Sequence, residues 1–416
     1  MRTCIFILFF FFKYTFVFAQ NSYPIVLIHG FMGWGPDEMS GYNYWGGKYD
    51  FKEYLESRGF EVFIVSIGPI SSNWDRAIET YYQLKGGQVD YGKKHSETYG
   101  LIQKPKNKNW EGLYPKWNSD NPIHIIGHSL GGQTARMLQF MLENEIFIDS
   151  SSSLVEESDL LGKKRMKWIR SITTISTPHN GTTLSNIVTT TLPFMEELIG
   201  LAAVIGNRFY DFDLEQWGFK RNQNEKWNKY FSRLMGHPAW ETKNFCAWDV
   251  SIDGAKELNS YLTTNSDIYY FSYSTSNTNK DMKTGFYKPN KSMSITLRPN
   301  AYMMGKKTDC WADGSCTDST WYENDGMVNT ISQIGPTTGL NSINKIITYE
   351  NENEISPGVW IYMGKYIMDH KAFMGHGKYS DAIFKIVYNV LDEHSEILKN
   401  LPDFKLKYLN NYNIVV

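Results

Sequence analysis

The sequence predicts an α/β fold with a mostly parallel central sheet, and three observations support that prediction. Short apolar runs recur along the chain with helical stretches between them, an alternation that is typical of parallel sheets. One run continues through Gly127-His128-Ser129-Leu130-Gly131 directly into a helical stretch. No repeat or long low-complexity linker divides the 416 residues. We therefore expect residues 20–416 to form a single domain that carries insertions.

The predicted strands are rich in Ile and Val, the residues that favour extended structure. They cover Ile25–Ile28, Val62–Ile67, Ile123–Ile126, Ile169–Ile175, Ile268–Tyr273 and Ile346–Tyr349. Helical stretches are expected over Gln133–Leu142 and Ala382–Leu398. The insertions cover about 72–118, 186–236 and 274–308, and the last of these is polar and rich in Lys and Asn.

Composition excludes one broad class of partner. With 42% apolar and 15% aromatic residues, the chain can bury a large core. Its 42 Lys and Arg residues oppose 44 Asp and Glu residues, which leaves a formal charge of -2. The chain as a whole thus lacks the basic excess that binding to nucleic acid requires, and we expect no nucleic-acid partner.

The N-terminus has the pattern of a secretory signal. Arg2 precedes two apolar runs, Cys4–Phe12 and Tyr14–Ala19, which Lys13 interrupts. The runs are too short for a membrane span, and Val17-Phe18-Ala19 offers small residues where a signal peptidase cleaves. We predict that residues 1–19 are a signal peptide and that the mature protein is secreted, the alternative being an uncleaved anchor.

Two of the four cysteines are close in sequence. Cys310 and Cys316 flank a five-residue segment, which could close as a disulfide loop in an oxidising compartment. The alternative is that they remain buried thiols, because the sequence does not give the Cα separation that a bridge requires. Cys246 is left without a partner in either case.

Ser129 is the candidate nucleophile. In the pattern Gly-x-Ser-x-Gly, a serine between a strand and a helix occupies a strained turn that projects its hydroxyl above the sheet. The small residues Gly127 and Gly131 let the strand and the helix pass close together. The alternative is an ordinary strand-to-helix turn, but the strand and helix that flank the motif favour the nucleophile.

A serine nucleophile needs a base and an acid, which follow it in the order acid, then histidine, in α/β-hydrolases. His370 lies in a predicted loop before the last helix and is favoured over His376, while His179 comes too early and His237 lies in an insertion. His394 has charged neighbours on the last helix, which indicates a solvated face. Asp325, before Gly326, is favoured as the acid over Asp369, because adjacent loop residues rarely point at one another.

Backbone amides must receive the negative charge that develops on the carbonyl oxygen of the substrate. One donor is expected to be the amide of Leu130, which follows the nucleophile. The second is expected from the loop after the first strand, His29-Gly30-Phe31-Met32-Gly33, where Phe31 is positioned to donate. We interpret His29 as a structural histidine.

Several long motifs closely resemble one family. They are His29-Gly30-Phe31-Met32-Gly33-Trp34-Gly35, Tyr44-Trp45-Gly46-Gly47, Gly68–Ala77, Gly86–Gly92, Tyr210–Gly218 and Glu323-Asn324-Asp325-Gly326. The chain after the signal resembles the large zinc-bearing triacylglycerol lipases of the staphylococcal and thermophilic Bacillus type. The resemblance implies an α/β-hydrolase fold with a helical lid and a small zinc-type insertion. It also implies that Ser129, Asp325 and His370 are the nucleophile, acid and base.

The resemblance implies metal sites that this chain holds only in part. Asp75, His95 and Asp249 match three zinc ligands of the family, but the fourth position holds Leu101. A structural zinc site normally has four protein ligands, so we expect an incomplete site. The acidic calcium ligands of the family are replaced by Ala372 and Gly377, and we expect no calcium there. The ester chemistry itself requires no cofactor.

An apolar stripe is formed by residues at helical spacing within 186–207, and its members are Phe194, Leu198, Leu201 and Ile205. A buried core helix would show the same stripe, but the resemblance implies a lid over the serine.

Together these features predict a secreted lipase that cleaves triacylglycerols at an oil–water interface, with no obligate protein partner to be inferred. The alternatives are a phospholipase, an esterase for soluble esters, or a non-catalytic lipid-binding protein.

Overall fold

The computed structural model describes residues 20–146, 158–185, 215–218, 222, 224–226, 228–229, 232, 242–338, 345–377 and 381–404. The predicted signal peptide and the apolar stripe of the expected lid lie outside these residues, as does His237. Within the described ranges, no helix is both long and apolar enough to cross a bilayer.

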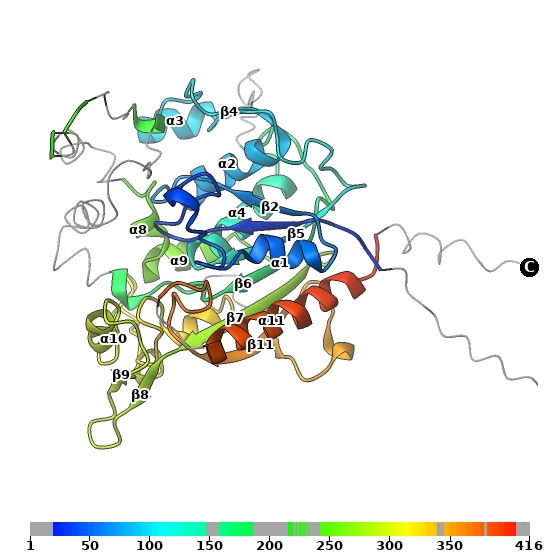
Figure 1. Cartoon of the computed structure of the whole chain (residues 1–416). Helices are drawn as coiled ribbons and strands as arrows, with labels where there is room; N and C mark the ends of the chain where they lie inside the picture. Colours follow the sequence, from blue (N-terminus) through cyan, green and yellow to red (C-terminus); the bar gives the residue numbers. More distant parts are fainter. Residues whose placement is uncertain are drawn as a thin grey trace, which may run out of the picture.

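A seven-stranded sheet forms the centre of the molecule (Figure 1), and all of its strand pairs are parallel. Its strands, in spatial order, are β10 (Ile346–Thr348), β11 (Trp360–Ile367), β7 (Tyr269–Ser276), β6 (Ile169–Ile175), β5 (Ile123–His128), β1 (Ile25–Ile28) and β2 (Val62–Val65). The predicted fold class is confirmed. All six predicted runs lie on strands of this sheet.

One strand was not predicted. Residues just before His370 were expected in a loop, but Tyr366 and Ile367 belong to β11, which pairs with β7 along Tyr366↔Thr275 and Ile367↔Ser276. The pairing shifts register between Tyr362 and Lys365, and Gly364 adopts a positive φ of 108° there. This irregularity breaks the alternation that would mark a strand in the sequence. The strand ends three residues before His370 and so delivers that residue to the edge of the sheet.

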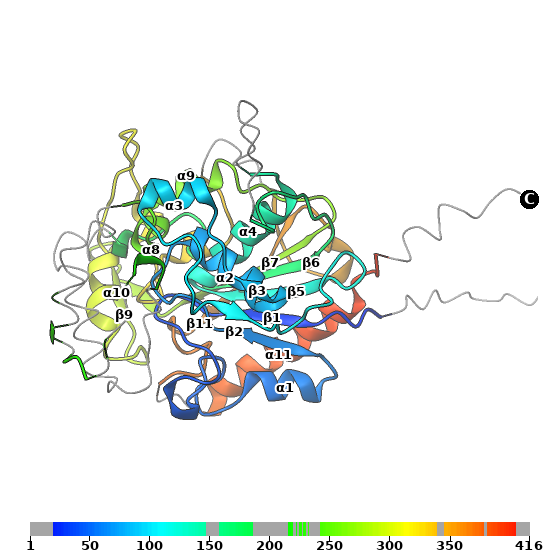
Figure 2. The same cartoon turned by 90° about the horizontal axis from the view of Figure 1, so that it is seen from above.

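Helices cover both faces of the sheet (Figure 2). The side chains of Val26 and Ile28 join the cluster formed with α2 (Asn73–Lys85), α4 (Leu130–Glu143) and α9 (Ile252–Asn259). The alternate residues Ile25 and Leu27 join the opposite cluster with α1 (Phe51–Ser57) and α11 (Asp381–Asn400). This period of two explains why β1 is apolar at every position.

The expectation that His394 lies on a solvated face is wrong. His394 is buried on the face of α11 that packs against the sheet, where Nε2 lies 2.7 Å from the Thr173 hydroxyl and Nδ1 lies 3.0 Å from the Tyr273 hydroxyl. Its charged sequence neighbours point elsewhere because successive helical residues are about 100° apart. A polar pair on two strands thus satisfies both nitrogens of a core histidine.

The remaining elements are short and lie at the margins of the sheet. The helices are α3 (Lys93–Tyr99), α8 (Cys246–Asp249) and α10 (Arg298–Met304), and the 3-10 turns are η1 (Met39–Gly41), η2 (Glu215–Trp217), η4 (Ser319–Trp321), η5 (Thr330–Gln333) and η6 (Glu352–Glu354). Two small antiparallel sheets pair β3 (Gly87–Gln88) with β4 (Asn109–Trp110), and β8 (Thr278–Lys280) with β9 (Tyr287–Pro289).

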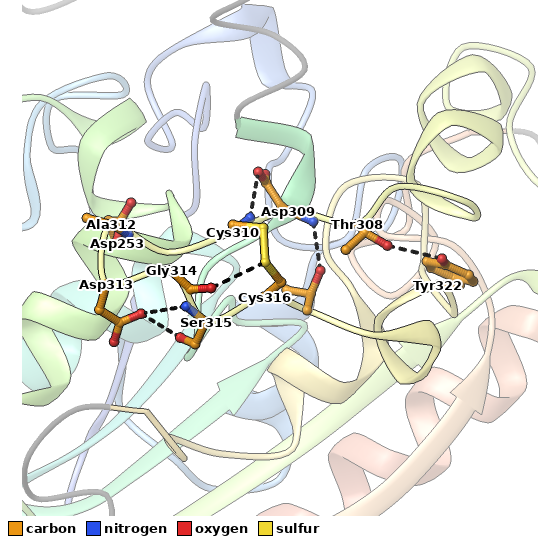
Figure 3. The surroundings of a disulfide bond; sticks show 11 residues. Asp253, Thr308, Asp309, Cys310, Ala312, Asp313, Gly314, Ser315, Cys316 and Tyr322 are labelled. Atoms are coloured by element: carbon orange, nitrogen blue, oxygen red, sulfur yellow. Dashed lines mark hydrogen bonds between the residues drawn. A yellow bond between two sulfur atoms is a disulfide. The ribbon is translucent and has the colours of Figure 1, made fainter.

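Cys310 and Cys316 are joined in a disulfide, with their Cα atoms 4.0 Å apart (Figure 3). The enclosed loop packs onto the start of α9. Lys256 donates to Asp313 at 2.5 Å, the Ala312 amide donates to Asp253, and the Trp311 indole donates to the Ile252 carbonyl. The bridge therefore holds together a loop that leads toward Asp325. Cys246 is a buried free thiol.

Candidate active site

Ser129 occupies the turn between β5 and α4 with a φ of 55° and a ψ of -128°. This positive φ is strained for a residue with a side chain. Glycines make the close packing around the turn feasible, since a Cβ atom on Gly127 would lie 2.5 Å from the Gly131 carbonyl oxygen. The Ser129 amide donates to the Ile175 carbonyl of β6 at 2.8 Å. The geometry is that of a nucleophile elbow.

Asp325 and His370 form a buried pair in which the Nδ1 atom of His370 lies 2.8 Å from Oδ2 of Asp325. The His370 amide also donates to the Asp325 carbonyl at 3.1 Å. The carboxylate accepts the Nδ1 proton, so the lone pair of the neutral ring lies on Nε2. That nitrogen is the one through which a histidine serves as general base toward a serine.

Four further donors hold the Asp325 carboxylate. Oδ1 accepts from the amides of Met327 and Val328 at 2.9 and 2.8 Å. Oδ2 accepts from the Thr275 hydroxyl at 2.8 Å and from the Gln333 amide at 3.0 Å. Both carboxylate oxygens are therefore engaged by hydrogen-bond donors. The group is thereby fixed in one orientation beside the His370 ring.

Thr275 and Gln333 did not emerge from the sequence. Thr275 is at the carboxyl end of β7, two residues beyond the predicted end of that strand at Tyr273. Gln333 ends η5, eight residues after Asp325. If the predicted strand had been extended to Ser276, Thr275 would have been placed at the edge of the sheet that carries the site. No sequence signal marks Gln333.

Asp369 does not face His370. Its Oδ1 atom accepts from the amides of Lys371 and Ala372, and its Oδ2 atom accepts from the Ser294 amide at 2.7 Å. The residue therefore ties the His370 loop to the segment that contains Ser294. Its carboxylate holds two loops together and does not orient the His370 ring.

The loop that carries Phe31 lies against the serine. A Cβ atom on Gly30 would lie 2.7 Å from Cβ of Ser129, so only glycine fits at this position. Phe31 and Ser129 line the same cavity, while Leu130 is the first residue of α4. The predicted amide donors thus come from the two segments that border the hydroxyl of Ser129.

A chain of hydrogen bonds links this loop to the His370 loop. The Gly30 amide donates to the Tyr44 hydroxyl at 2.9 Å, so the hydroxyl proton is directed to Nδ1 of His128 at 2.6 Å. Nε2 of His128 then donates to the His370 carbonyl at 3.2 Å. Burial lowers the pKa of His128 well below its usual range, in agreement with the neutral ring that this pattern requires. The sequence analysis assigned no role to Tyr44 or His128.

A cavity of about 510 Å³ opens beside Ser129 and His370. Apolar side chains supply much of its wall, namely Phe31, Met32, Trp34, Met39, Leu297, Met327 and Met374. Ser294, Thr296 and Asn300 add polar groups from the segment around α10. A cavity with these walls suits an acyl chain next to a polar reacting group.

The other histidines have different partners. His376 lines the cavity but its Nε2 atom lies 2.6 Å from the Tyr44 carbonyl. His29 is buried, with Nδ1 2.9 Å from the Gly30 carbonyl and Nε2 accepting from the Ile67 amide. His179 is buried beside the Thr174 hydroxyl. In the described structure, His370 is the histidine that combines a carboxylate partner with a place in the Ser129 cavity.

The three residues at the expected zinc positions are near one another but do not converge as ligands. Nε2 of His95 is 2.9 Å from Oδ1 of Asp75, and the Asn244 amide occupies Oδ2 at 3.0 Å. The Asp249 carboxylate accepts from the Asn73 amide at 2.5 Å, and burial raises its pKa to about 8. The described residues contain no group of three or more His, Cys, Asp or Glu arranged to hold a metal. The expectation of an incomplete zinc site stays a prediction.

The three other metal positions offer no ligand atoms from side chains. Leu101, at the fourth zinc position, packs against the apolar cluster that contains α2 and α4. At the calcium positions, Ala372 is buried, and Gly377 borders the Ser129 cavity. A methyl group cannot coordinate a hard cation, and the expected absence of calcium stays a prediction.

Comparison with known proteins shows extensive similarity. Residues 21–398 match a family model described as "Lipase-like, C-terminal domain". Lipase 1 of Staphylococcus aureus strain MRSA252 is 34% identical over 366 residues, which are 86% of this chain and 51% of that protein. The chain thus spans about half the length of the curated relatives it matches.

Two similar solved structures are matched over most of their own length. EstA from Clostridium botulinum is 35% identical with a TM-score of 0.82, and the match covers 93% of this chain and 89% of that one. The lipase of Staphylococcus hyicus is 30% identical with a TM-score of 0.77, and the match covers 93% and 99% of the two chains.

Proposed function

The chain belongs to the family of lipase-like C-terminal domains, and from this premise we propose that it is a secreted lipase that hydrolyses the carboxylic ester bonds of triacylglycerols. The observation that carries the proposal is the joint geometry of a strained serine, a buried Asp325–His370 pair and an apolar cavity that contains both Ser129 and His370. An ordinary strand-to-helix turn would not be expected to combine these three features.

In the proposed reaction, the Ser129 hydroxyl oxygen attacks the ester carbonyl carbon while Nε2 of His370 takes the hydroxyl proton. The amides of Phe31 and Leu130 donate to the oxyanion of the tetrahedral intermediate. His370 then gives the proton to the departing alcohol, which leaves an acyl group on Ser129. Water repeats the sequence and releases the fatty acid. These steps use only the chain's own groups, so we expect no cofactor to be required.

The apolar wall of the cavity supports a water-insoluble substrate. Met32, Leu297 and Met327 offer a long apolar surface next to the reacting serine, and burial of each methylene of an acyl chain contributes about 0.8 kcal/mol. The relatives that are named lipases support the same class of substrate. The expected location outside the cell rests on the N-terminal pattern of the sequence.

Three rival functions remain as outcomes of the test. The same catalytic groups would serve a phospholipase or an esterase for soluble esters. A non-catalytic lipid-binding protein would keep the cavity but would not need the strained serine or the oriented base. The complete set of reacting groups favours an enzyme.

The test compares purified wild type with Ser129→Ala on tributyrin, triolein, phosphatidylcholine and a soluble p-nitrophenyl ester. We expect triolein and tributyrin to be hydrolysed, and Ser129→Ala to lose activity on all four substrates while it keeps its circular dichroism spectrum. Preference for phosphatidylcholine or for the soluble ester would identify one of the rival enzymes. Wild-type activity in Ser129→Ala would exclude the mechanism.

A further inference from the structure

Residues 278–308, here called the basic segment, concentrate positive charge in a chain that is otherwise acidic. The segment contains seven Lys or Arg residues and a single acidic residue, Asp281, whereas the whole chain has 42 basic and 44 acidic residues. Five of the lysines have exposed side chains, namely Lys280, Lys283, Lys288, Lys291 and Lys306. Asp281 is paired with Lys288 at 2.5 Å. The segment therefore presents net positive charge to solvent.

The same segment exposes large apolar side chains. Met282 is 87% exposed and Ile295 is 77% exposed, and these are the two highest values among the large hydrophobic residues that the structure describes. Phe286 and Tyr302 are also exposed. Scattered apolar residues on a surface are ordinary, but four of the ten such residues found in the described ranges fall within these 31 positions. A surface that combines exposed lysines with exposed apolar tips is typical of binding to lipid headgroups.

The basic segment is continuous with the cavity of Ser129. Ser294, Thr296 and Leu297 line that cavity, so Ile295 projects to solvent from the rim itself. The β8–β9 hairpin and α10 lie together at one corner of the molecule, and the hairpin projects from it (Figure 1). The Ser294 amide donates to Asp369, the residue before His370. Contact at this surface therefore occurs beside the place where a substrate must enter.

The segment is held firmly to the rest of the fold. The Asn277 side-chain oxygen accepts from the side chains of Asn290 and Ser292 at 2.9 and 3.0 Å. Within the segment, the Tyr287 amide donates to the Gly305 carbonyl at 2.8 Å, and from outside it the Asn324 side chain donates to the Ala301 carbonyl at 3.2 Å. The exposed groups thus sit on a fixed platform and lose little conformational entropy when they bind.

We propose that the basic segment docks the protein onto a phospholipid surface that carries negative charge. The lysines contact the headgroups, Met282 and Ile295 enter the interfacial layer, and the mouth of the Ser129 cavity then faces the lipid. This inference rests on the proposed lipid substrate and adds a docking surface made of residues outside the catalytic groups. Charge complementarity selects the anionic surface, because each lysine near such a surface strengthens binding by about fivefold at moderate salt.

The test uses full-length Ser129→Ala protein, so that vesicles are not hydrolysed, in cosedimentation with phosphatidylglycerol/phosphatidylcholine vesicles and with pure phosphatidylcholine vesicles. We expect tighter binding to the mixed vesicles and a loss of that preference at high salt. Met282→Asp with Ile295→Asp should weaken binding to mixed vesicles by about tenfold or more. Lys280→Ser with Lys283→Ser should weaken it by about fivefold per lysine and leave binding to neutral vesicles unchanged.

Met166→Asp is the matched control. Met166 is an exposed methionine between Arg165 and Lys167, and it precedes β6, at the sheet edge opposite Ser129. The Met166→Asp variant should bind vesicles like the parent protein. Equal weakening by Met166→Asp, or vesicle binding unchanged in both variants of the basic segment, would overturn the proposal.

A separate assay distinguishes this inference from the proposed function. In proteins that retain Ser129, Met282→Asp should hydrolyse a soluble short-chain ester at the wild-type rate, and should hydrolyse triacylglycerol emulsified with phosphatidylglycerol more slowly than wild type. A wild type that binds anionic vesicles but hydrolyses no ester would contradict the proposed function and leave the docking surface supported. Equal rates for wild type and Met282→Asp on emulsion would overturn the docking surface alone.

Discussion

Two buried Asp–His pairs lie in the described part of the chain and have nearly the same distance between the ring nitrogen and the carboxylate oxygen. Asp325 and His370 are 2.8 Å apart, and Asp75 and His95 are 2.9 Å apart. A buried serine accompanies each pair, Ser129 in the first region and Ser72 in the second. The same three residue types therefore occur twice, although only one set has the arrangement of a hydrolase site.

The serines show why the two regions differ. Ser129 has a φ of 55° and lines the apolar cavity with His370. Ser72 has an ordinary φ of -62° and caps α2, since its hydroxyl accepts from the Asp75 amide at 3.1 Å and donates to the Asn244 side chain at 2.6 Å. A hydroxyl that is engaged as a helix cap is not available as a nucleophile.

The histidines differ in the nitrogen that meets the carboxylate. His370 uses Nδ1, so Nε2 is directed to the side of the ring away from its own backbone. His95 uses Nε2, while the Trp74 ring stacks on it with centroids 5.1 Å apart and the Tyr99 ring packs at 4.9 Å. The pair at Asp75 thus joins α2 to α3 as a structural contact. An Asp–His pair becomes a catalytic candidate only through the groups that face its free side.

The largest expected effect on kcat distinguishes the Asp325 carboxylate from the Asp75 carboxylate. Asp325→Asn should lower kcat by about 10⁴-fold, because the amide would donate to Nδ1 and leave the proton on Nε2, where it blocks the base. Asp75→Asn should leave kcat within about twofold and should lower the free energy of unfolding by about 1 to 3 kcal/mol, since it disturbs a buried hydrogen bond. Steady-state kinetics and urea unfolding measure both. A comparable loss of kcat in Asp75→Asn would mean that the second pair also serves catalysis.

A histidine without a carboxylate provides a reference for both pairs. Burial lowers the pKa of His394 to about 3, so below pH 6.5 the unfolded chain takes up a proton that the folded chain does not. Stability is therefore fully present above pH 6.5 and should fall by about 1.4 kcal/mol per pH unit from this group as the pH drops toward 3. In His394→Gln this contribution should vanish from the pH dependence of unfolding.

Thr173→Val is the control for that experiment. It removes the hydrogen bond to Nε2 of His394 but no titrating group, so it should lose stability at neutral pH and keep the slope of the wild type. If His394→Gln retained the wild-type slope, the acid sensitivity would have to come from other buried histidines such as His124, whose pKa burial also lowers to about 3.

Tyr44→Phe tests whether the first pair depends on its supporting network. Tyr44 acts as a positioning residue, because its hydroxyl joins the Gly30 amide to His128 and so to the His370 loop. Loss of one hydrogen bond of about 1.4 kcal/mol corresponds to about a tenfold fall in kcat, with little change in KM for a soluble ester. Tyr54→Phe on α1 is the matched control and should have wild-type kinetics. An unchanged kcat in Tyr44→Phe would show that Gly30 and His370 hold their places without the network.

The smallest effect concerns metal at the second pair. Since Asp75, His95 and Asp249 do not converge as ligands, dialysis against a strong chelator should shift Tm by less than about 1 °C. Leu101→His restores the ligand type at the fourth position and should make Tm rise when zinc is added. Stoichiometric zinc that survives chelation of the wild type would show that other groups complete a site.

The predictable parts of the fold share one property. β1, β5 and β6 are buried at every position, and each contains several Ile or Val residues, or both, that mark it as a strand in the sequence. β11 is partly exposed along most of its length and has an irregular register near Gly364, and it was not predicted. His394 was misplaced because the composition of its neighbours says little about which side of α11 it faces. The sequence patterns thus failed for a strand that is partly exposed and for a helix that buries a polar residue.

The same distinction applies to the candidate site. Ser129 was identified from ten contiguous residues, because the elbow is a local structure made by a strand, two glycines and a helix. Phe31 and Leu130 followed from adjacent segments. Tyr44 and His128 are 84 residues apart, and Thr275 meets Asp325 across 50 residues. No local pattern marks such contacts.

By itself, the sequence determined the apolar runs of the strands, the elbow at Ser129 and the short spacing of Cys310 and Cys316, because each depends on residues that are neighbours in the chain. Only the tertiary structure decided which of two Asp–His pairs shares a cavity with Ser129, and that a basic, apolar segment borders the same cavity. The physical reason is that a side chain's chemistry depends on its partners and its solvent. Those are set by strand register and loop packing between segments far apart in the chain.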